Sequence, residues 1–526
     1  MSPTEVPLGK AGTGRSEPAD LHSVTREVSV AFAGNLASYL FVIAHGFLMA
    51  PVYLKFVGLG MYGVWLTVFQ ALGWMALLDP GLSDIGRQRI AHAYGRGDSR
   101  AISRSMGALI ALSAGVGLIL LIVGAGLCAV LPQILQVPES GEGAVQAAGF
   151  LLAANAAVTL QVHALGCVLQ ATQRAKAQTI VIAIGNAAGL AATASFVVGG
   201  LGIEGISLGY LARSTIWICG LAGVVLVLVT KKLLPRPALH WPAAREFVSL
   251  SRHAGLGKLS HLLHFNMDAL AAGLICGAPA AAQLVLTGRL FELARTVPTL
   301  FSSAAAPGLT HIAASEGGVH VARSSRRYFT VVGQMTAVLC GAALVLTPDV
   351  TVLWMGPNAY GGPVLCAFLG LAAVSSALLT GPFNVLFAQG EIQSSSQAMF
   401  RFGALKLVLV LILMPFVGVV AAPVATALAA STTAMPAMLR SCRLRLRLSR
   451  RRFRYHLRAL FLAPAACLLA GAVLLLLWQG AASGWLMAAA KAAIVVLLLL
   501  TLTASLMPRW NRRLLENYRS RFSVGL

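Results

Sequence analysis

Residues 105–132 read SMGALIALSAGVGLILLIVGAGLCAVLP, an apolar stretch without a single charged side chain. Because a bilayer core about 30 Å thick is crossed by roughly 20 helical residues, this stretch predicts a transmembrane helix. The whole chain has the same character, since 57% of its 526 residues are hydrophobic and only 11% are charged. Its mean hydropathy is +0.79, and soluble domains carry about 25% charged residues. The sequence therefore predicts an all-α polytopic membrane protein.

Apolar windows of similar length recur along the whole chain, and we place fourteen of them. Ionisable residues interrupt the window at 253–277, and two prolines interrupt the window at 420–439. An even number of spans returns the chain to the side of the membrane on which it started. The expected spans are 28–53, 61–86, 104–132, 146–170, 177–200, 205–230, 253–277, 281–311, 328–347, 362–389, 402–418, 420–439, 457–478 and 484–507.

The basic residues predict which side of the membrane each loop faces. The chain has 40 Lys and Arg against 17 Asp and Glu, a net charge of +23, and Lys and Arg are retained in cytoplasmic loops. With the N-terminus inside, the basic loops between alternate spans face the cytoplasm, and this scheme also places Lys406 on the cytoplasmic side. Lys55 is then the single base in the outer loops. We therefore expect a multi-pass protein of the cytoplasmic (inner) membrane with both termini in the cytoplasm, and no nucleic-acid partner.

A short repeat predicts two lobes. The sequence Pro80-Gly81-Leu82-Ser83 ends the second span, and Pro307-Gly308-Leu309-Thr310 ends the eighth. Parallel or inverted repeats are common in transporters that work by alternating access. The match favours two six-helix lobes in parallel repeat around a central cavity, followed by two C-terminal helices. The expected segments are a disordered cytoplasmic tail (1–27), an N-terminal lobe (28–230), a cytoplasmic linker (231–252), a C-terminal lobe (253–439), a basic cytoplasmic loop (440–456), two additional transmembrane helices (457–507) and a basic cytoplasmic tail (508–526).

Three segments near the N-terminus resemble a known family. They are PVYLKFVGLGMYGVW at 51–65, LDPGLS at 78–83 and RQRIA at 87–91. Together they resemble the start of polysaccharide-type flippases of the multidrug/oligosaccharidyl-lipid/polysaccharide exporter superfamily, which includes the O-antigen repeat-unit and lipid II flippases. The resemblance covers residues 28–105, and the second lobe lacks the Tyr-Gly-Val-Trp block. It implies a V-shaped pair of lobes around a cavity, with the tail of a lipid-linked substrate in a groove extended by the helices at 457–478 and 484–507.

The resemblance implies a transporter rather than an enzyme. Such a protein flips a polyprenyl-pyrophosphate-linked oligosaccharide, the precursor of a cell-surface polysaccharide such as the O-antigen of lipopolysaccharide, by alternating access and without a cofactor. The expected partners are this lipid-linked oligosaccharide, a polysaccharide polymerase or assembly complex and, from the basic run at 443–454, anionic membrane lipids. Two alternatives stay open: a cation-coupled multidrug exporter of the same superfamily, and a membrane-embedded glycan polymerase or glycosyltransferase, which would need a longer outer loop.

Two sets of ionisable residues lie inside the expected spans and define a candidate site. A charge at mid-membrane costs about 2.5 kcal/mol or more, so such residues face a cavity or a partner. Within each set the spacing of three or four residues places the side chains on one helix face. The first set is Lys258, His261, His264 and Asp268, and the second is Arg289, Glu292 and Arg295.

The two sets allow a structural and a functional interpretation. Counted from a turn near Ala278, Asp268 is level with Arg289, so the sets could hold two helices together through ion pairs. Alternatively, surplus cations receive a pyrophosphate or an acidic sugar, since arginine forms bidentate bonds with phosphate oxygens. A third alternative is proton coupling. The candidates for the headgroup are Arg213, Lys258, Arg289 and Arg295, and those for coupling or ion pairing are His261, His264, Asp268 and Glu292.

Other polar residues have weaker patterns. We expect a gate or a structural cap at the inner end of the second span, from Asp79, Asp84, Arg87 and Arg89. His45 and Asn35 could line the cavity or make a polar helix contact. The basic run at 443–454 is either an anionic-lipid patch or a topology anchor, and Lys491 is expected to extend toward an outer interface. No nucleophile motif or metal-ligand cluster is apparent, so we expect neither a catalytic nor a metal site.

Overall fold

The computed structural model describes residues 41, 45–75, 81–315, 318–478 and 484–506. This part of the chain is helical and contains no β-strand. A first helical segment covers residues 45–56. The elements that follow are α2 (Leu59–Gly73), α3 (Leu82–Gly95), α4 (Ser99–Ile134), α5 (Glu139–Ala171), α6 (Ala175–Val198), α7 (Gly202–Thr230), α8 (Trp241–Phe265), α9 (Asp268–Ile275), α10 (Ala278–Ser315), α11 (Gly318–Met355), η2 (Pro357–Ala359), α12 (Gly362–Ala388), α13 (Ile392–Val417), η3 (Gly418–Val420), α14 (Ala421–Ala429), the π-helical turn η4 (Ala430–Ala434), α15 (Met435–Arg445), α16 (Arg450–Leu477) and α17 (Trp485–Ser505).

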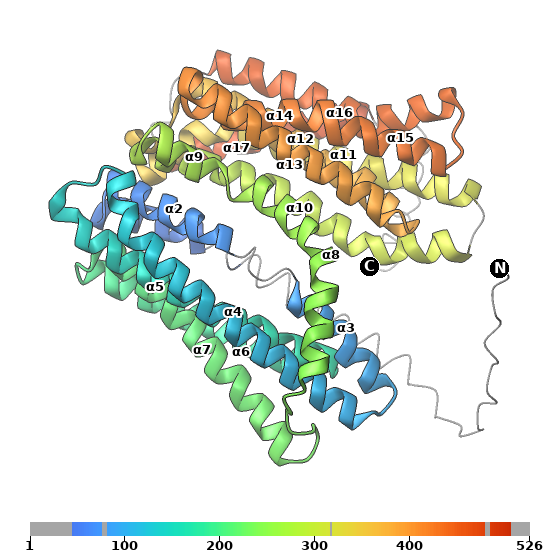
Figure 1. Cartoon of the computed structure of the whole chain (residues 1–526). Coiled ribbons are helices and arrows are strands. Elements are labelled where there is room, and N and C mark those ends of the chain that lie inside the picture. Colours follow the sequence, from blue (N-terminus) through green and yellow to red (C-terminus); the bar gives the residue numbers. More distant parts are fainter. Residues whose placement is uncertain (1–40, 42–44, 76–80, 316–317, 479–483, 507–526) are drawn as a thin grey trace, which may run out of the picture.

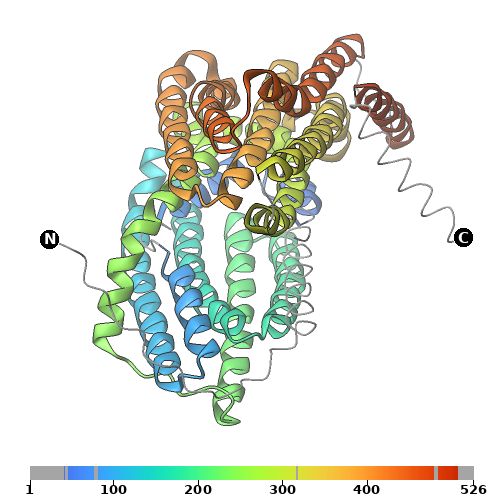
Figure 2. The same ribbon diagram turned by 90° about the vertical axis from the view of Figure 1, so that its right-hand side faces the viewer.

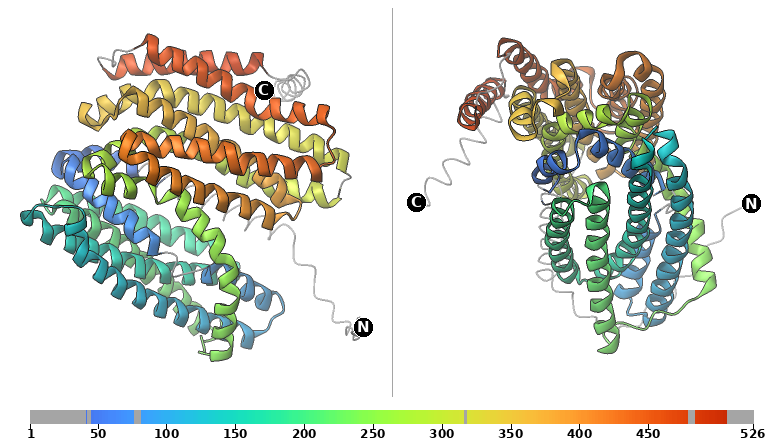
Figure 3. Two further views of the ribbon diagram at one scale, coloured as in Figure 1. Left: turned by 45° about the horizontal axis from the view of Figure 1, so that its top comes forward. Right: turned by 90° about the vertical axis from the view of Figure 1, so that its left-hand side faces the viewer.

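The helices form two lobes that meet at one end and diverge toward the other (Figure 1). The N lobe contains the segment 45–56 and α2–α7, and the C lobe contains α9–α15 with α16 and α17 on its far side (Figures 2 and 3). Within the N lobe α5 packs on α4 and α7, and within the C lobe α10 packs on α11 and α12. The arrangement confirms the predicted fold class, and the chain is a multi-pass membrane protein.

Small residues let the two lobes approach at the closed end, which we define as the contact of α2 with α9 and α10. A Cβ atom at Gly63 of α2 would lie 1.8 Å from the carbonyl oxygen of Ala278. A Cβ atom at Gly273 of α9 would lie 2.0 Å from Oγ1 of Thr67. Glycine at helix crossings permits such close backbone approach inside membranes. Nε1 of Trp354 also donates to the carbonyl oxygen of Phe47, 3.0 Å away, and joins the lobes at this end.

The helix α8 connects the lobes at the opposite, open end, which we define by α3, the start of α8 and the connections at 231–240 and 446–449. Phe247 is fully buried in the N-lobe core, whereas Leu263, near the other end of α8, packs against Gly403 of α13 in the C lobe. The expected linker at 231–252 is therefore too long, because α8 already begins at Trp241. Charged residues in the first half of α8 lower its hydropathy, so the apolar pattern does not predict a helix before residue 253.

The expected second span at 61–86 is not one helix. The helix α2 ends at Gly73, and α3 begins after Gly81, whose φ of 104° lies in the left-handed region. The second copy of the short repeat behaves differently, since Pro307 and Gly308 lie inside the continuous helix α10. The two motifs thus occupy different local structures.

Within the described part of the chain, nine helical stretches are long and apolar enough to cross a membrane. One of them, Gln393–Arg445, contains the two expected spans 402–418 and 420–439. Gly418, with a φ of 63°, separates α13 from α14 inside this stretch. The helix α10 is not among the nine, although it has 38 residues. Charged residues along α10 lower its hydropathy, and these charges belong to the candidate site.

The two additional helices cover the face of the C lobe that is remote from the N lobe (Figure 3). The helix α16 packs along α11, and α17 also contacts α11. Nζ of Lys491 in α17 lies 2.7 Å from a carboxylate oxygen of Asp349 in α11, and Asp349 is fully buried. The expectation that Lys491 extends toward the interface is therefore wrong, because a buried acid on the neighbouring helix offers a closer partner.

Candidate functional site

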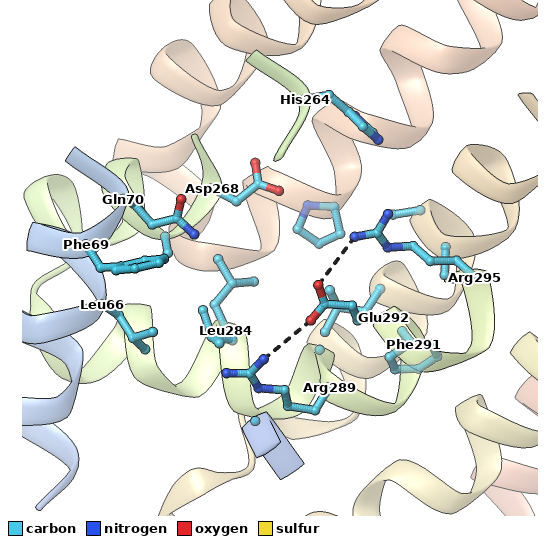
Figure 4. Close-up of a pocket in the computed structure, with 18 of the residues that line it drawn as sticks. Leu66, Phe69, Gln70, His264, Asp268, Leu284, Arg289, Phe291, Glu292 and Arg295 are labelled. Atoms are coloured by element: carbon cyan, nitrogen blue, oxygen red, sulfur yellow. Dashed lines mark ion pairs between the residues drawn. The ribbon is translucent and has the colours of Figure 1, made fainter. Parts of the chain in front are cut away.

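A cavity of about 490 Å³ lies between the two lobes. Its N-lobe wall comes from the segment 45–56, α2 and α7, and its C-lobe wall comes from α10, α12, α13, α14 and the junction of α8 with α9 (Figure 4). Since both lobes contribute, a change in the angle between them would change the cavity. We call it the central cavity.

The N-lobe wall of the central cavity is aromatic. Trp65 and Phe69 are four residues apart on α2, so their rings lie on one helix face, and they stack with centroids 5.2 Å apart. Tyr210 of α7 meets Trp65 with a centroid distance of 5.5 Å. Trp217, seven residues further along α7, lies on the same face. The result is a largely apolar wall with flat ring faces.

One cation, Arg213, lies within this aromatic wall. Its guanidinium carbon is 4.5 Å from the ring centroid of Tyr210 and 4.8 Å from that of Trp217. Gly189 of α6 makes room for it, because a Cβ atom there would lie 2.5 Å from Cβ of Arg213. In the described part of the chain no ion pair of Arg213 is found, and its Nε atom is buried without a hydrogen bond. Ring faces, rather than a carboxylate, therefore stabilise this charge.

The C-lobe wall carries a row of charges on α10. Glu292 lies between two arginines, with carboxylate oxygens 3.5 Å from Nη1 of Arg289 and 3.7 Å from Nη2 of Arg295 (Figure 4). The three side chains share one helix face, as their spacing predicts, and both arginines are about one-quarter exposed. Arg289 also reaches the N lobe, where its Nη2 donates to the hydroxyl of Tyr62 at 3.4 Å. Arg289 therefore links the charged row of the cavity to the contact between the lobes at the closed end.

A third ion pair joins α9 to α13. Nζ of Lys406 lies 2.9 Å from the carboxylate of Asp268 and 2.7 Å from the carbonyl oxygen of His264, and Lys406 is 1% exposed. The chain is not helical between α8 and α9, so the last carbonyl groups of α8 need new partners. Lys406 supplies one, and Nε1 of Trp74 supplies another by donating to the carbonyl oxygen of Asn266 at 3.1 Å.

This pair corrects two expectations. Lys406 was placed on the cytoplasmic side, but it lies inside α13 and lines the central cavity. Asp268 was expected to pair with Arg289, but Asp268 pairs with Lys406 and Arg289 pairs with Glu292. The expectation that Asp268 lies level with Arg289 requires one continuous helix over residues 253–277. The chain is not helical at Asn266, so the count along the helix does not hold. The signal for Lys406 was present, since it is a base followed at once by the apolar run LVLVLILM.

The structure places the other candidate residues as follows. His264 is buried in the cavity wall with its ring centroid 4.8 Å from that of Phe402, and His45 is buried there near Tyr53. At the open end Arg87 pairs with Asp84 at 2.6 Å, and Arg89 pairs with Glu246 of α8. Both pairs lie outside the cavity; the first lies within α3, and the second connects α3 with α8. The side chains of Lys258 and His261, and the residues Asp79 and Asn35, are outside the described part of the chain.

Comparisons with known proteins identify the fold. No family model matches the sequence, and no curated protein matches it at a significant level. Among solved structures, the chain is similar to the lipid II flippase MurJ in an inward closed conformation, with a TM-score of 0.66 and 10% identity over 92% of this chain and 99% of that one. It is also similar to a multidrug resistance MATE family transporter, with a TM-score of 0.61 and 14% identity over 78% of this chain and 96% of that one in the inward-facing conformation. For a MATE family transporter in the outward-facing conformation, the TM-score is 0.53, with 14% identity over 81% of this chain and 95% of that one.

These similarities show that the chain has the fold of the multidrug/oligosaccharidyl-lipid/polysaccharide exporter superfamily, as its N-terminal segments predicted. The neighbours are transporters. The TM-score is higher for the inward-facing than for the outward-facing MATE structure.

Proposed function

We propose that the protein flips a polyprenyl-pyrophosphate-linked oligosaccharide across the cytoplasmic membrane by alternating access. The observation that carries the proposal is the charge of the central cavity. Four bases and two acids line it, and the bases come from both lobes. A pyrophosphate group would find bidentate donors in the arginines. The members of this set are Arg213, Arg289, Arg295 and Lys406, with Asp268 and Glu292.

The two walls suit the two parts of such a headgroup. The ring faces of Trp65, Phe69 and Tyr210 offer flat apolar surfaces for the C–H faces of sugar rings, and pockets for such ligands are commonly lined by aromatic side chains. The charged row on α10 offers the guanidinium groups that phosphate oxygens need. A lipid-linked sugar would therefore lie with its oligosaccharide against α2 and α7 and its pyrophosphate against α10.

The basic residues support a cytoplasmic position for the open end. Arg96, Arg100 and Arg323 are exposed there, and Lys and Arg are retained on the cytoplasmic side. In this orientation the described conformation faces inward, so the cavity receives substrate from the inner leaflet, where lipid-linked precursors are made. Both termini are then cytoplasmic.

The proposal is tested by reconstituting the purified protein in liposomes that contain a polyprenyl-pyrophosphate oligosaccharide with a fluorescent sugar. A membrane-impermeant reductant bleaches the outer leaflet and reports how much label crosses. We expect crossing with the wild type and at least about a tenfold slower crossing for Arg213→Ala and Arg295→Ala, each of which removes a phosphate-bonding cation. Crossing at the same rate in protein-free liposomes would contradict the proposal.

A second candidate function is cation-coupled export of drugs, as in the MATE neighbours. The aromatic wall of the central cavity favours it, since Trp65 and Tyr210 could stack on a planar drug. The surplus of bases opposes it for cationic drugs, because like charges repel. Drug accumulation in cells that lack their own exporters separates the two candidates. Lower ethidium accumulation without any effect on lipid-linked sugars would favour the exporter.

A further inference from the structure

A second cavity, which we call the arginine pocket, lies at the open end of the C lobe. Its volume is about 1000 Å³. The start of α11, the end of α15, the connection at 446–449 and the start of α16 form its walls, so it is separate from the central cavity. Six arginines line it, and its described lining contains no Asp or Glu. They are Arg323, Arg326, Arg327, Arg445, Arg447 and Arg452.

The helix dipole adds to the positive charge of the pocket at one of its walls. Arg452 lies in the first turn of α16, where the dipole contributes partial positive charge and a base is disfavoured, whereas Arg445 lies in the last turn of α15, where a base is favoured. Glu391 pairs with Arg445, which leaves a clear excess of positive charge around the pocket.

The walls of the pocket are held in place by packing and hydrogen bonds. The two ring nitrogens of buried His456 lie 3.0 Å from the carbonyl oxygens of Arg452 and Ala322, so this side chain joins α16 to α11. Leu446 and Leu448, in the connection between α15 and α16, are buried in the C-lobe core. The arginines therefore project from a fixed frame rather than from a loose tail.

We propose that the arginine pocket binds the phosphate headgroup of an anionic phospholipid in the leaflet at the open end. Basic pockets between transmembrane helices on the cytoplasmic side bind such headgroups. The rim has the amphipathic character of a membrane interface, because Tyr455 is 43% exposed and Leu444 is 67% exposed. The guanidinium of Arg326 lies 5.5 Å from the ring centroid of Tyr455, which places a cation beside this rim.

The test compares two variants with the same change of charge. The pocket variant carries Arg323→Gln, Arg327→Gln and Arg447→Gln, all exposed positions in the pocket lining. The control variant carries Arg96→Gln, Arg100→Gln and Arg104→Gln, exposed positions at the open end of the N lobe. Each full-length protein is purified in a neutral detergent and titrated with dioctanoyl-phosphatidylglycerol, with dioctanoyl-phosphatidylcholine as reference. Binding is followed by tryptophan fluorescence.

We expect phosphatidylglycerol to bind the pocket variant at least about tenfold more weakly than the wild type, and the control variant within about twofold. A further variant with lysine at the three pocket positions keeps the charge and should retain most of the affinity, which separates charge from loss of fold. Equal weakening in both glutamine variants would assign the effect to diffuse surface charge and overturn the proposal. Sodium pyrophosphate that binds the wild type as tightly as phosphatidylglycerol would overturn the assignment to a lipid.

Discussion

Nζ of Lys406 in α13 lies 2.9 Å from the carboxylate of Asp268 in α9, and the same ammonium group donates to the carbonyl oxygen of His264. A single buried cation thus joins a partly exposed carboxylate of α9 to the C-terminal end of α8. Lys406 is 1% exposed and Asp268 is 34% exposed, so the two partners depend on each other unequally.

This inequality predicts an asymmetric mutational effect. Asp268→Asn leaves a buried lysine without its counter-ion, which can cost about 3–5 kcal/mol. Lys406→Met leaves a carboxylate that still reaches water in the cavity, so we expect a smaller loss of stability. The double variant should recover much of the loss caused by Asp268→Asn. Melting temperatures in detergent measure the stability of the two single variants and the double variant. Equal losses of stability in the two single variants would show that the difference in exposure between Lys406 and Asp268 does not determine the effect.

Arg213 should be important for transport but not for stability. Its removal leaves no buried acid behind, since its described partners are the rings of Tyr210 and Trp217. We expect Arg213→Gln to lower flipping at least about tenfold while the melting temperature stays near that of the wild type. Arg96→Gln, an exposed cation outside the cavity, is the matched control. Parallel loss of transport and stability in Arg213→Gln would assign Arg213 to the scaffold.

The closed end depends on the absence of a side chain at position 63. In Gly63→Ala the new Cβ atom would lie 1.8 Å from the carbonyl oxygen of Ala278, so α2 and α10 cannot meet as described. Gly60→Ala is the matched control, because no atom lies within 4 Å of a Cβ at that position of α2. We expect Gly63→Ala, unlike Gly60→Ala, to shift the protein away from this conformation.

A cysteine at buried Ala359, which packs in the same cluster as α2, can report this shift. An impermeant maleimide should label Ala359→Cys faster in the Gly63→Ala background than in the Gly60→Ala background. Unchanged labelling would mean that the helices adjust locally without separating the lobes.

The attachment of α17 should depend on the pair between Asp349 and Lys491. Asp349 is fully buried, so Lys491→Met leaves a buried carboxylate whose cost is about 3–5 kcal/mol. The double variant with Asp349→Asn should restore most of the stability. Thermal unfolding in nanodiscs provides the measurement. If Lys491→Met alone leaves the unfolding temperature unchanged, the pair does not hold α17.

The regular apolar helices could be predicted from the sequence, because their signal is local. The span at 205–230, for example, corresponds closely to α7 (Gly202–Thr230), and Arg213 stands out in it as a lone cation. The row Arg289, Glu292 and Arg295 was also predictable, since three- and four-residue spacing fixes a helix face.

Partners on distant helices were harder to predict. Lys406 was assigned to a cytoplasmic segment because counting bases by loop ignores a base inside an apolar run. Its pairing with Asp268 depends on the helix break at Asn266, between the end of α8 and the start of α9. The pair of Asp349 with Lys491 joins elements far apart in the sequence. Local periodicity contains no information on such long-range contacts.

Arg289 belongs to two parts of the molecule at once, since it lines the central cavity and bonds to Tyr62 across the closed end. An anion that binds in the cavity would compete with Tyr62 and Glu292 for the same guanidinium group. By thermodynamic linkage, the anion can shift the equilibrium between closed and separated lobes only by the difference in its binding free energy for the two states. At Arg289, this difference is limited by the cost of breaking the contacts with Tyr62 and Glu292. Anion binding in the cavity should therefore weaken the contact between the lobes at the closed end, and a variant that weakens this contact should bind the anion more tightly. Measuring either effect gives the size of the other.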